Sequence, residues 1–131
     1  MSIRSSQLSK VRKMVEPFTV LGIETSCDDT AVSLVSSNKI VFSQIVRSQH
    51  ASHAKTQGIV PSVAAEEHRT YIPDVIKKAF SMAKCSINDI NAVAATRGPG
   101  IAGSLIVGFS AGRILAAVTN KPFFSINHMV F

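Results

Sequence analysis

The segment Val20–Val35, VLGIETSCDDTAVSLV, most constrains the fold, because two apolar runs flank a short polar stretch. The first run suits a strand packed on both faces, and the run that begins at Thr30 is typical of a second strand. Between them lie hydroxyls, a thiol and the adjacent acids Asp28 and Asp29. The pattern predicts two strands joined by a polar turn, and the turn is where we expect chemistry.

The acid pair has two interpretations that the spacing leaves open. Adjacent carboxylates can hold a divalent cation or order water around a phosphate, because hard oxygen ligands suit hard cations. The simpler alternative is a solvated turn in which Asp stabilises the bend by bonding its own backbone. Taken alone, so short a motif favours the simpler alternative.

The chain has 131 residues and an apolar content of 46%, which is enough for one domain with a single core. Its formal charge of +6 is uneven, since four of the 14 basic residues precede the first acid, Glu16. Beyond Glu16, ten basic residues face seven acids, an excess that is compatible with a nucleic-acid partner but does not require one. Cys27 and Cys85 are expected to be free thiols, because two cysteines without a secretion signal form no disulfide framework.

Residues 1–17 form a basic leader rich in Arg, Lys and Ser that lacks the apolar core of a secretory signal. We expect a mitochondrial targeting peptide, and hence a mitochondrial protein. The alternative is a basic tail on a cytosolic protein. The longest uncharged run, Gly98–Gly112, is too short and too rich in Gly and Pro to cross a bilayer, so we expect no membrane insertion.

The rest of the chain, residues 18–131, is predicted to fold as an α/β lobe with the element order βββαβαβ. Alternating and buried runs predict the strands, and apolar residues at spacings of three to five predict the helices. Pro73 predicts a kink or break in the first helix, and the second is apolar nearly all round, which predicts burial on every side. A meander followed by αβαβ describes the ribonuclease H-like half of an actin-type fold, a mixed five-stranded sheet with helices packed on it. The expected strands are Phe18–Thr25, Thr30–Ser36, Ile40–Val46, Ile90–Thr96 and Pro122–Asn127, and the expected helices are Ser62–Lys84 and Ile101–Thr119.

The turn Gly98-Pro99-Gly100 joins a predicted strand to a predicted helix. Backbone N–H groups at the start of that helix can face an anionic ligand, so phosphate binding is one interpretation and a plain strand-to-helix turn is the other. The glycines within the helix, Gly103, Gly108 and Gly112, are assigned to close packing against the sheet.

The chain has four histidines, each of which could in principle bind a metal. His68 lies on the apolar stripe of the first helix, which favours a hydrogen-bonded, half-buried imidazole over a ligand. His50 and His53 lie in a segment without period and make a weak metal signal. His128 directly follows the last strand, at the edge where open α/β sheets bind ligands. Cys27, beside two acids, is expected to be a poor thiolate.

Together these residues resemble the TsaD-type tRNA threonylcarbamoyladenosine synthase family, which includes the Kae and Qri proteins. The likeness runs from Val20 to Met129, with the basic leader closest to the mitochondrial branch. It rests on several ordered motifs, which are Val20–Ala31, Ser48-Gln49 with His53, Gly58–Pro61, His68, Thr96–Gly108, Lys121–Phe123 and His128-Met129.

The resemblance implies transfer of a threonylcarbamoyl group from threonylcarbamoyl-adenylate onto the amino group of an adenosine beside the tRNA anticodon. It implies tRNA and the adenylate as partners, a homodimer, and one divalent metal ion, iron or zinc. Carried over by position, His128 matches a metal ligand. Asp28 and Asp29 match the catalytic acids, and the residues that match the nucleotide site are Cys27, Thr30, Gly98, Pro99 and Gly100.

The chain departs from the family pattern at several positions. Ser62 stands where the family has Glu, Gln57 stands where it has Gly, and the motif H-M-E-x-H is represented by His128–Phe131 alone. The resemblance therefore implies only the N-terminal lobe, and we expect no turnover from these 131 residues by themselves. Two alternatives stay open, a non-catalytic TsaB-type scaffold and a small-molecule kinase of the same superfamily.

Overall fold

The computed structural model describes residues 17–49 and 60–127, and their elements follow the predicted order. The boundaries differ from the predicted ones by no more than two residues, and a short 3₁₀ turn precedes the fourth strand. The elements are β1 (Thr19–Glu24), β2 (Thr30–Ser36), β3 (Val41–Arg47), α3 (Pro61–Ala83), η1 (Ile87–Asp89), β4 (Ala92–Gly98), α4 (Ala102–Val118) and β5 (Phe123–Asn127).

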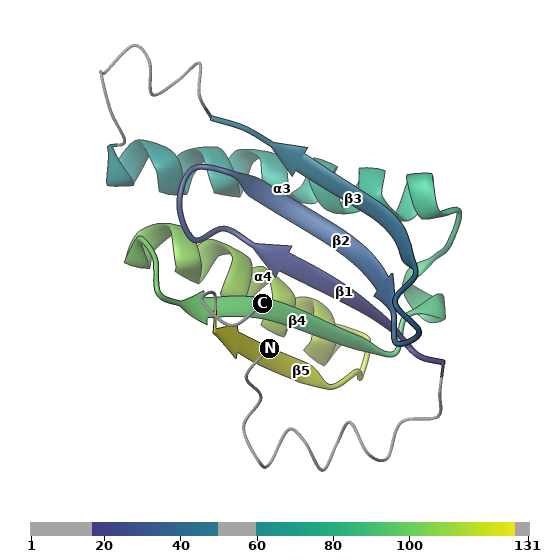
Figure 1. Ribbon diagram of the computed structural model, residues 1–131. Helices are drawn as coiled ribbons and strands as arrows, with labels where there is room; N and C mark the ends of the chain where they lie inside the picture. Colours follow the sequence, from purple (N-terminus) through teal and green to yellow (C-terminus); the bar gives the residue numbers. More distant parts are fainter. Residues whose placement is uncertain (1–16, 50–59, 128–131) are drawn as a thin grey trace.

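The five strands form one mixed sheet in the order β3-β2-β1-β4-β5 (Figure 1). The pairs β1–β2 and β2–β3 are antiparallel, whereas β1–β4 and β4–β5 are parallel. Parallel neighbours need a crossover, and α3 and α4 supply the two crossovers. The prediction of a mixed five-stranded sheet, built from a meander followed by αβαβ, is confirmed.

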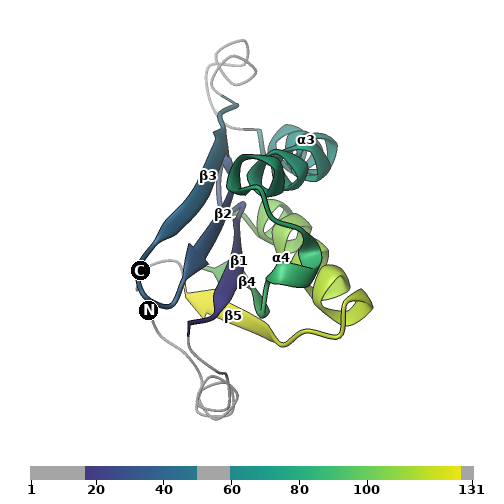
Figure 2. The ribbon, with the colours of Figure 1, turned by 90° about the vertical axis from the view of Figure 1, so that its right-hand side faces the viewer.

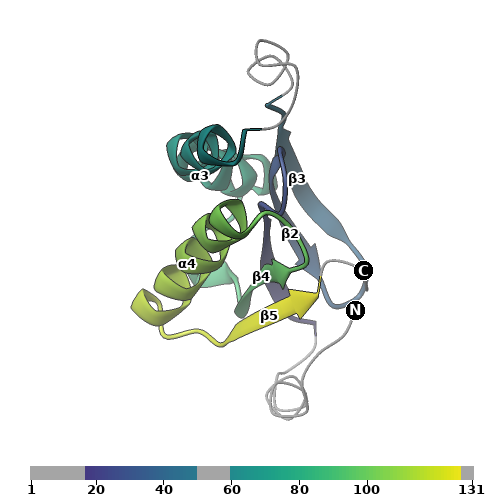
Figure 3. The same cartoon turned by 90° about the vertical axis from the view of Figure 1, so that its left-hand side faces the viewer.

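Both described helices lie on the same face of the sheet, as the two side views show (Figures 2 and 3). Strand alternation sends one set of side chains toward them, including Leu21 and Ile23 of β1 and Val32 and Leu34 of β2. The core therefore lies between the sheet and the helices. The helices contribute Ile72, Val75, Ala79, Val107 and Ala116 to it.

The opposite face of the sheet carries a shallow groove of about 630 Å³. Its floor is built from the alternate residues of the central strands, such as Val20, Gly22, Ala31 and Ser33. A small second cluster of Ala92, Ala94, Phe124 and Ile126, with Val20 beside it, gathers at the β4–β5 side.

The predicted break at Pro73 and the predicted burial of α4 on every side are wrong, whereas a kink at Pro73 stays a prediction. Helix α3 continues without a break from Pro61 to Ala83 through Pro73, whose ring is exposed to solvent. Helix α4 is not buried on every side, because Ile106, Ile114 and Val118 are 60%, 64% and 78% exposed. Only one stripe of α4 meets the sheet, since a helix packed on one face of a sheet hides only the side that it turns toward it.

The packing role of the α4 glycines is confirmed at two of three positions. A Cβ on Gly108 would lie 2.5 Å from Thr25 Oγ1, and one on Gly112 would lie 2.8 Å from the Phe123 ring. Gly103 instead faces helix α3, where a Cβ would make an ordinary 3.7 Å contact with Ala65. None of the helices in the described ranges is long and apolar enough to cross a membrane.

Candidate active site at the carboxyl edge of the sheet

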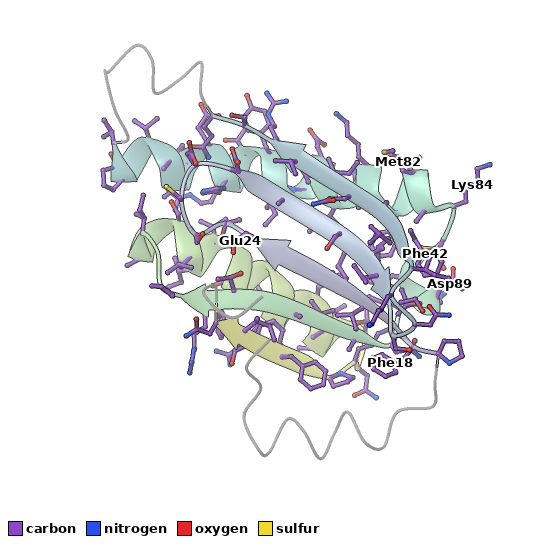
Figure 4. All side chains as sticks on the ribbon, viewed as in Figure 1. Phe18, Glu24, Phe42, Met82, Lys84 and Asp89 are labelled. Atoms are coloured by element: carbon purple, nitrogen blue, oxygen red, sulfur yellow. The ribbon has the colours of Figure 1, made fainter. Side chains whose placement is uncertain are left out.

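The turn that carries the acids and the bend that carries the glycines lie at the same edge of the sheet. Strands β1 and β4 are parallel neighbours, so their carboxyl ends meet there. Figure 4 places Glu24 at this edge, beside the β1–β2 turn, and Phe18 and Asp89 at the opposite edge. The turn and the bend therefore lie together at this edge, whereas His128, which the sequence also assigns to it, lies outside the described residues.

The two segments touch through their backbones. The Ile101 N–H donates to the Ser26 carbonyl oxygen at 2.7 Å. Gly100 lies so close that a Cβ there would stand 2.5 Å from the Ser26 carbonyl oxygen and 2.7 Å from its Cβ. Real Cβ atoms are never that near to a backbone oxygen, so glycine is required at this approach. The peptide bond between Gly98 and Pro99 in the same bend is cis.

Glu24, at the end of β1, braces the start of the turn. Its carboxylate accepts a hydrogen bond from the Ser26 N–H and another, at 2.6 Å, from the Thr96 hydroxyl of β4. Bonds to a charged acceptor are the stronger kind, so this carboxylate links two neighbouring strands just where the turn begins.

Thr25 ties the turn to the first half of α4. Its hydroxyl donates to the Ser104 carbonyl oxygen at 2.7 Å and accepts from the Gly108 N–H at 3.1 Å. Those two backbone groups are the pair that an uninterrupted helix would join to each other. Thr25, which is 2% exposed, thus bonds to both of these backbone groups and joins the residue after β1 to α4.

His68 reaches the far side of the turn from α3. Its Nε2 lies 2.8 Å from the Cys27 carbonyl oxygen, and its Nδ1 lies 2.6 Å from the Thr30 hydroxyl oxygen. The side chain is fully buried, and that burial lowers the pKa of the imidazole below its ordinary value. The expected hydrogen-bonded imidazole is confirmed, although it is more deeply buried than half.

The acids themselves are half-buried and stand between these supports. Asp29 Oδ1 is shielded from solvent and has no hydrogen-bond partner, which is unusual for a buried carboxylate oxygen. The Cys27 side chain is exposed, and partial burial of its sulfur, with the charge of Asp28 beside it, raises the pKa of the thiol. The prediction of a poor thiolate is confirmed, with desolvation as the larger cause. Both cysteines are free, as expected.

The structure brings together most of the residues that the sequence singled out at this edge. The acid turn with Cys27 and Thr30 adjoins the Gly98–Gly100 bend, while Thr30 itself is 1% exposed and bonded to His68. Sequence reasoning missed the supporting roles of Glu24, Thr25 and Thr96. One available signal was that polar residues continue two apolar strands at their carboxyl ends, where a buried position demands a partner. His128, and likewise His50 and His53, lie outside the described residues.

A metal site is not complete within residues 17–49 and 60–127. No group of three His, Cys, Asp or Glu side chains there is placed to hold an ion. Asp29 Oδ1, which has no hydrogen-bond partner, offers one oxygen ligand, and one ligand is too few to hold a metal ion. The described residues alone do not fit a bound metal.

The sheet order and the two crossovers on one face define the class of this protein, an α/β lobe of the actin-like, ribonuclease H-like kind. Two solved structures share this fold, YeaZ from Pseudomonas aeruginosa and a second Pseudomonas aeruginosa protein described as similar to the peptidase YEAZ. Their TM-scores are 0.66 and 0.65, at 15% and 16% sequence identity. Each match covers 84% of this chain and 44% or 43% of the other chain, and identities this low show the fold alone.

The family follows from the sequence comparisons. Residues 40–131 match the family model of TsaD, tRNA N6-adenosine threonylcarbamoyltransferase, and the chain belongs to that family.

Two curated relatives carry the same name. One, from Thermosipho melanesiensis, is 49% identical over 111 residues, which cover 85% of this chain and 34% of the relative. Another, from Rickettsia bellii, is 43% identical over 110 residues, which cover 84% of this chain and 32% of the relative. The chain therefore spans about a third of the length of these relatives.

Proposed function

We propose that this chain forms the N-terminal lobe of a tRNA N6-adenosine threonylcarbamoyltransferase. The proposed reaction transfers the threonylcarbamoyl group of threonylcarbamoyl-adenylate to N6 of the adenosine beside the tRNA anticodon. One observation carries the proposal. The acid turn and the glycine bend of the family motif touch at the carboxyl edge of the sheet, through the 2.7 Å bond from the Ile101 N–H to the Ser26 carbonyl oxygen.

The geometry suits the bend to phosphate binding and the acid turn to proton transfer. The Gly98–Gly100 bend leads into α4, whose first N–H groups suit the phosphate of an adenylate. In the transfer, N6 attacks the carbamoyl carbon, the bond to the phosphate oxygen breaks, AMP leaves, and N6 loses a proton. Asp29, whose side chain is half-buried at this edge, suits the acceptance of that proton, while Asp28 supplies negative charge beside it.

A chimera tests the proposal directly. The 111 residues that align with the Thermosipho melanesiensis relative replace the corresponding third of that protein. We expect the chimera to convert unmodified tRNA to threonylcarbamoyladenosine when it is given threonylcarbamoyl-adenylate. The relative lacking its N-terminal third serves as the negative control, and mass spectrometry of the digested tRNA is the measurement.

Two substitutions sharpen that experiment. Asp29→Asn in the chimera should lower turnover by about a hundredfold, a typical loss for removal of a proton acceptor. Asn38→Asp, in the hairpin turn between β2 and β3, adds a charge away from the site and should leave turnover unchanged. A folded chimera that makes no product would overturn the proposal, and so would one that hydrolyses ATP with a small-molecule acceptor and no need for tRNA, which would favour the kinase alternative.

Metal binding, dimer formation and cellular location are also parts of the proposal. The resemblance assigns one metal ligand to His128, and the described residues supply no complete site, so the roles proposed for Asp28 and Asp29 do not depend on a metal.

We propose that residues 1–17 direct the protein to mitochondria, since they carry four basic residues before their single acid, Glu16. A fluorescent protein fused behind these residues should enter mitochondria, and diffuse cytosolic fluorescence would contradict the targeting role.

A further inference from the structure

His68 is the one side chain of α3 that makes hydrogen bonds on both sides of the acid pair. Cys27 precedes Asp28, and Thr30 follows Asp29, so the imidazole bonds to the residues that flank the two acids. The side chain is 0% exposed and lies 38 residues from Thr30 along the sequence. A contact this distant is created only by the packing of α3 against β2.

The chemistry of the two partners fixes the state of the ring. A backbone carbonyl only accepts, so the proton must sit on Nε2, which donates to the Cys27 oxygen. Nδ1 of the neutral imidazole is then an acceptor, and the Thr30 hydroxyl donates to it. Burial lowers the pKa of His68 and favours this neutral form, even though the bond to the Cys27 carbonyl and the nearby acids of the turn act in the opposite direction.

The bonds from His68 restrain the backbone of the turn. Residues 25–29 lie outside both strands, so the hydrogen bonds between strands do not hold them. Cys27 is exposed and carries the carbonyl that His68 holds, while Thr30 is the first residue of β2. With the Ser26 carbonyl held by Ile101 and the Cys27 carbonyl held by His68, the peptide groups leading into the acid pair are fixed from α4 and from α3.

We propose that His68 is a positioning residue of the transferase, which holds the Cys27 carbonyl and the Thr30 hydroxyl and so fixes where Asp28 and Asp29 present their carboxylates to substrate. The proposal rests on the proposed function. It adds a role for a fully buried residue that acts through the residues it bonds. Because an error of about 1 Å in placing a reacting group can cost about a hundredfold in rate, such a clamp matters to turnover.

Two substitutions at His68 separate hydrogen bonding from packing. His68→Leu fills the site without polar groups and leaves both partners unbonded. His68→Gln keeps an N–H donor and an oxygen acceptor at the end of the side chain. The reporter is the rate at which iodoacetamide labels Cys27 in the 131-residue chain, resolved from Cys85 by peptide mass spectrometry. We expect labelling of Cys27 to quicken about threefold or more in His68→Leu and to stay near the original rate in His68→Gln.

A matched control tests whether any weakening of α3 would do the same. The Ser43 hydroxyl donates at 2.7 Å to the Ala79 carbonyl, a buried bond between the sheet and the same helix but away from the turn. Ser43→Ala should leave Cys27 labelling unchanged. If His68→Leu does not fold, Thr30→Val and Thr30→Ser form the substitute pair. Only Thr30→Val, which removes the hydroxyl, should quicken the labelling.

The chimera supplies the functional readout. His68→Leu should lower kcat about tenfold or more while KM for tRNA changes less than about threefold, and His68→Gln should recover most of the rate. Failure of the proposed function would appear as an unsubstituted chimera that makes no product. Failure of this inference would appear as a fully active His68→Leu chimera, or as Cys27 labelling that Ser43→Ala quickens as much as His68→Leu does.

Discussion

The middle of β1 and the turn that directly follows it are held by different interactions, although Ile23 and Thr25 are only two positions apart. In the middle, Leu21 and Ile23 are 0% and 3% exposed and pack among apolar side chains of β2 and the helices. In the turn, Thr25 and Ser26 are buried nearly as well, at 2% and 7%, yet Thr25 bonds to Ser104 and Ser26 bonds to Glu24. Burial alone therefore does not distinguish core from site.

The difference lies in what each region tolerates. Apolar contacts are non-directional, so the middle of the strand accepts side chains of similar volume. A buried hydrogen bond needs a specific atom at a specific distance, and the turn relies on several, from α3, α4 and β4. A core substitution should thus change stability and spare the turn, whereas a substitution at the end of β1 should change the turn at a smaller cost in stability.

The largest effect is expected from emptying the core. Leu34→Ala removes a side chain that is 0% exposed, and we expect the free energy of unfolding to fall by about 2–5 kcal/mol. Urea titration followed by circular dichroism measures it. Val46→Ala, at a position 53% exposed, is the control and should stay within about 0.5 kcal/mol. A Leu34→Ala chain that remains folded but labels faster at Cys27 by local opening would break the comparison.

Overpacking between β1 and α4 comes next. Gly108→Ala places a Cβ 2.5 Å from Thr25 Oγ1 and 3.1 Å from Ile23 Cγ2, so the free energy of unfolding should fall by about 1–3 kcal/mol. Gly103→Ala is the matched control in the same helix. Its Cβ meets Ala65 at 3.7 Å, so this change should be neutral or stabilising by up to about 1 kcal/mol. Thermal unfolding of the two variants, measured side by side, shows whether each substitution lowers or raises the free energy of unfolding.

Removing the Thr25 hydroxyl isolates the hydrogen bonds at the end of the strand. Thr25→Val keeps the shape but brings a methyl group to the two backbone atoms of α4 that the hydroxyl bonds, so we expect a loss of about 1–2 kcal/mol. Thr25→Ser keeps the hydroxyl and should lose less. Equal unfolding free energies for the two variants would show that packing, not hydrogen bonding, holds this end of β1.

The smallest effect is a pH dependence that arises from His68. Its pKa in the folded chain lies below the ordinary 6.5, so the unfolded chain binds more protons as the pH falls through that value. The contribution of the neutral imidazole is fully present above about pH 6.5 and is lost as the pH falls toward the folded pKa. Urea titrations at about pH 7.5 and 5.5 should show a greater loss of stability for the unsubstituted chain than for His68→Gln. An identical loss in both chains would contradict the neutral, buried imidazole.

Much of the fold could be predicted because its signals are local. The alternation in Thr30–Ser36 and the apolar spacing along α3 mark elements whose type depends on neighbouring residues only. The errors at α4 and Pro73 share another cause. Composition shows that α4 is apolar but not which of its sides the sheet covers. A helix that is packed along its whole length, such as α3, can tolerate a proline on its exposed face.

The sequence by itself determined the order of the strands and helices, the family, and the two motifs that meet at the site, because periodicity, turn chemistry and short ordered motifs are written in adjacent residues. Only the tertiary structure decided which distant groups hold the acid turn. The bonds from His68 to Cys27 and Thr30, and from Thr25 to Ser104, span between 38 and 79 positions. Such pairs form when helices dock on the sheet and buried polar atoms must find partners, and no local pattern specifies which partners those will be.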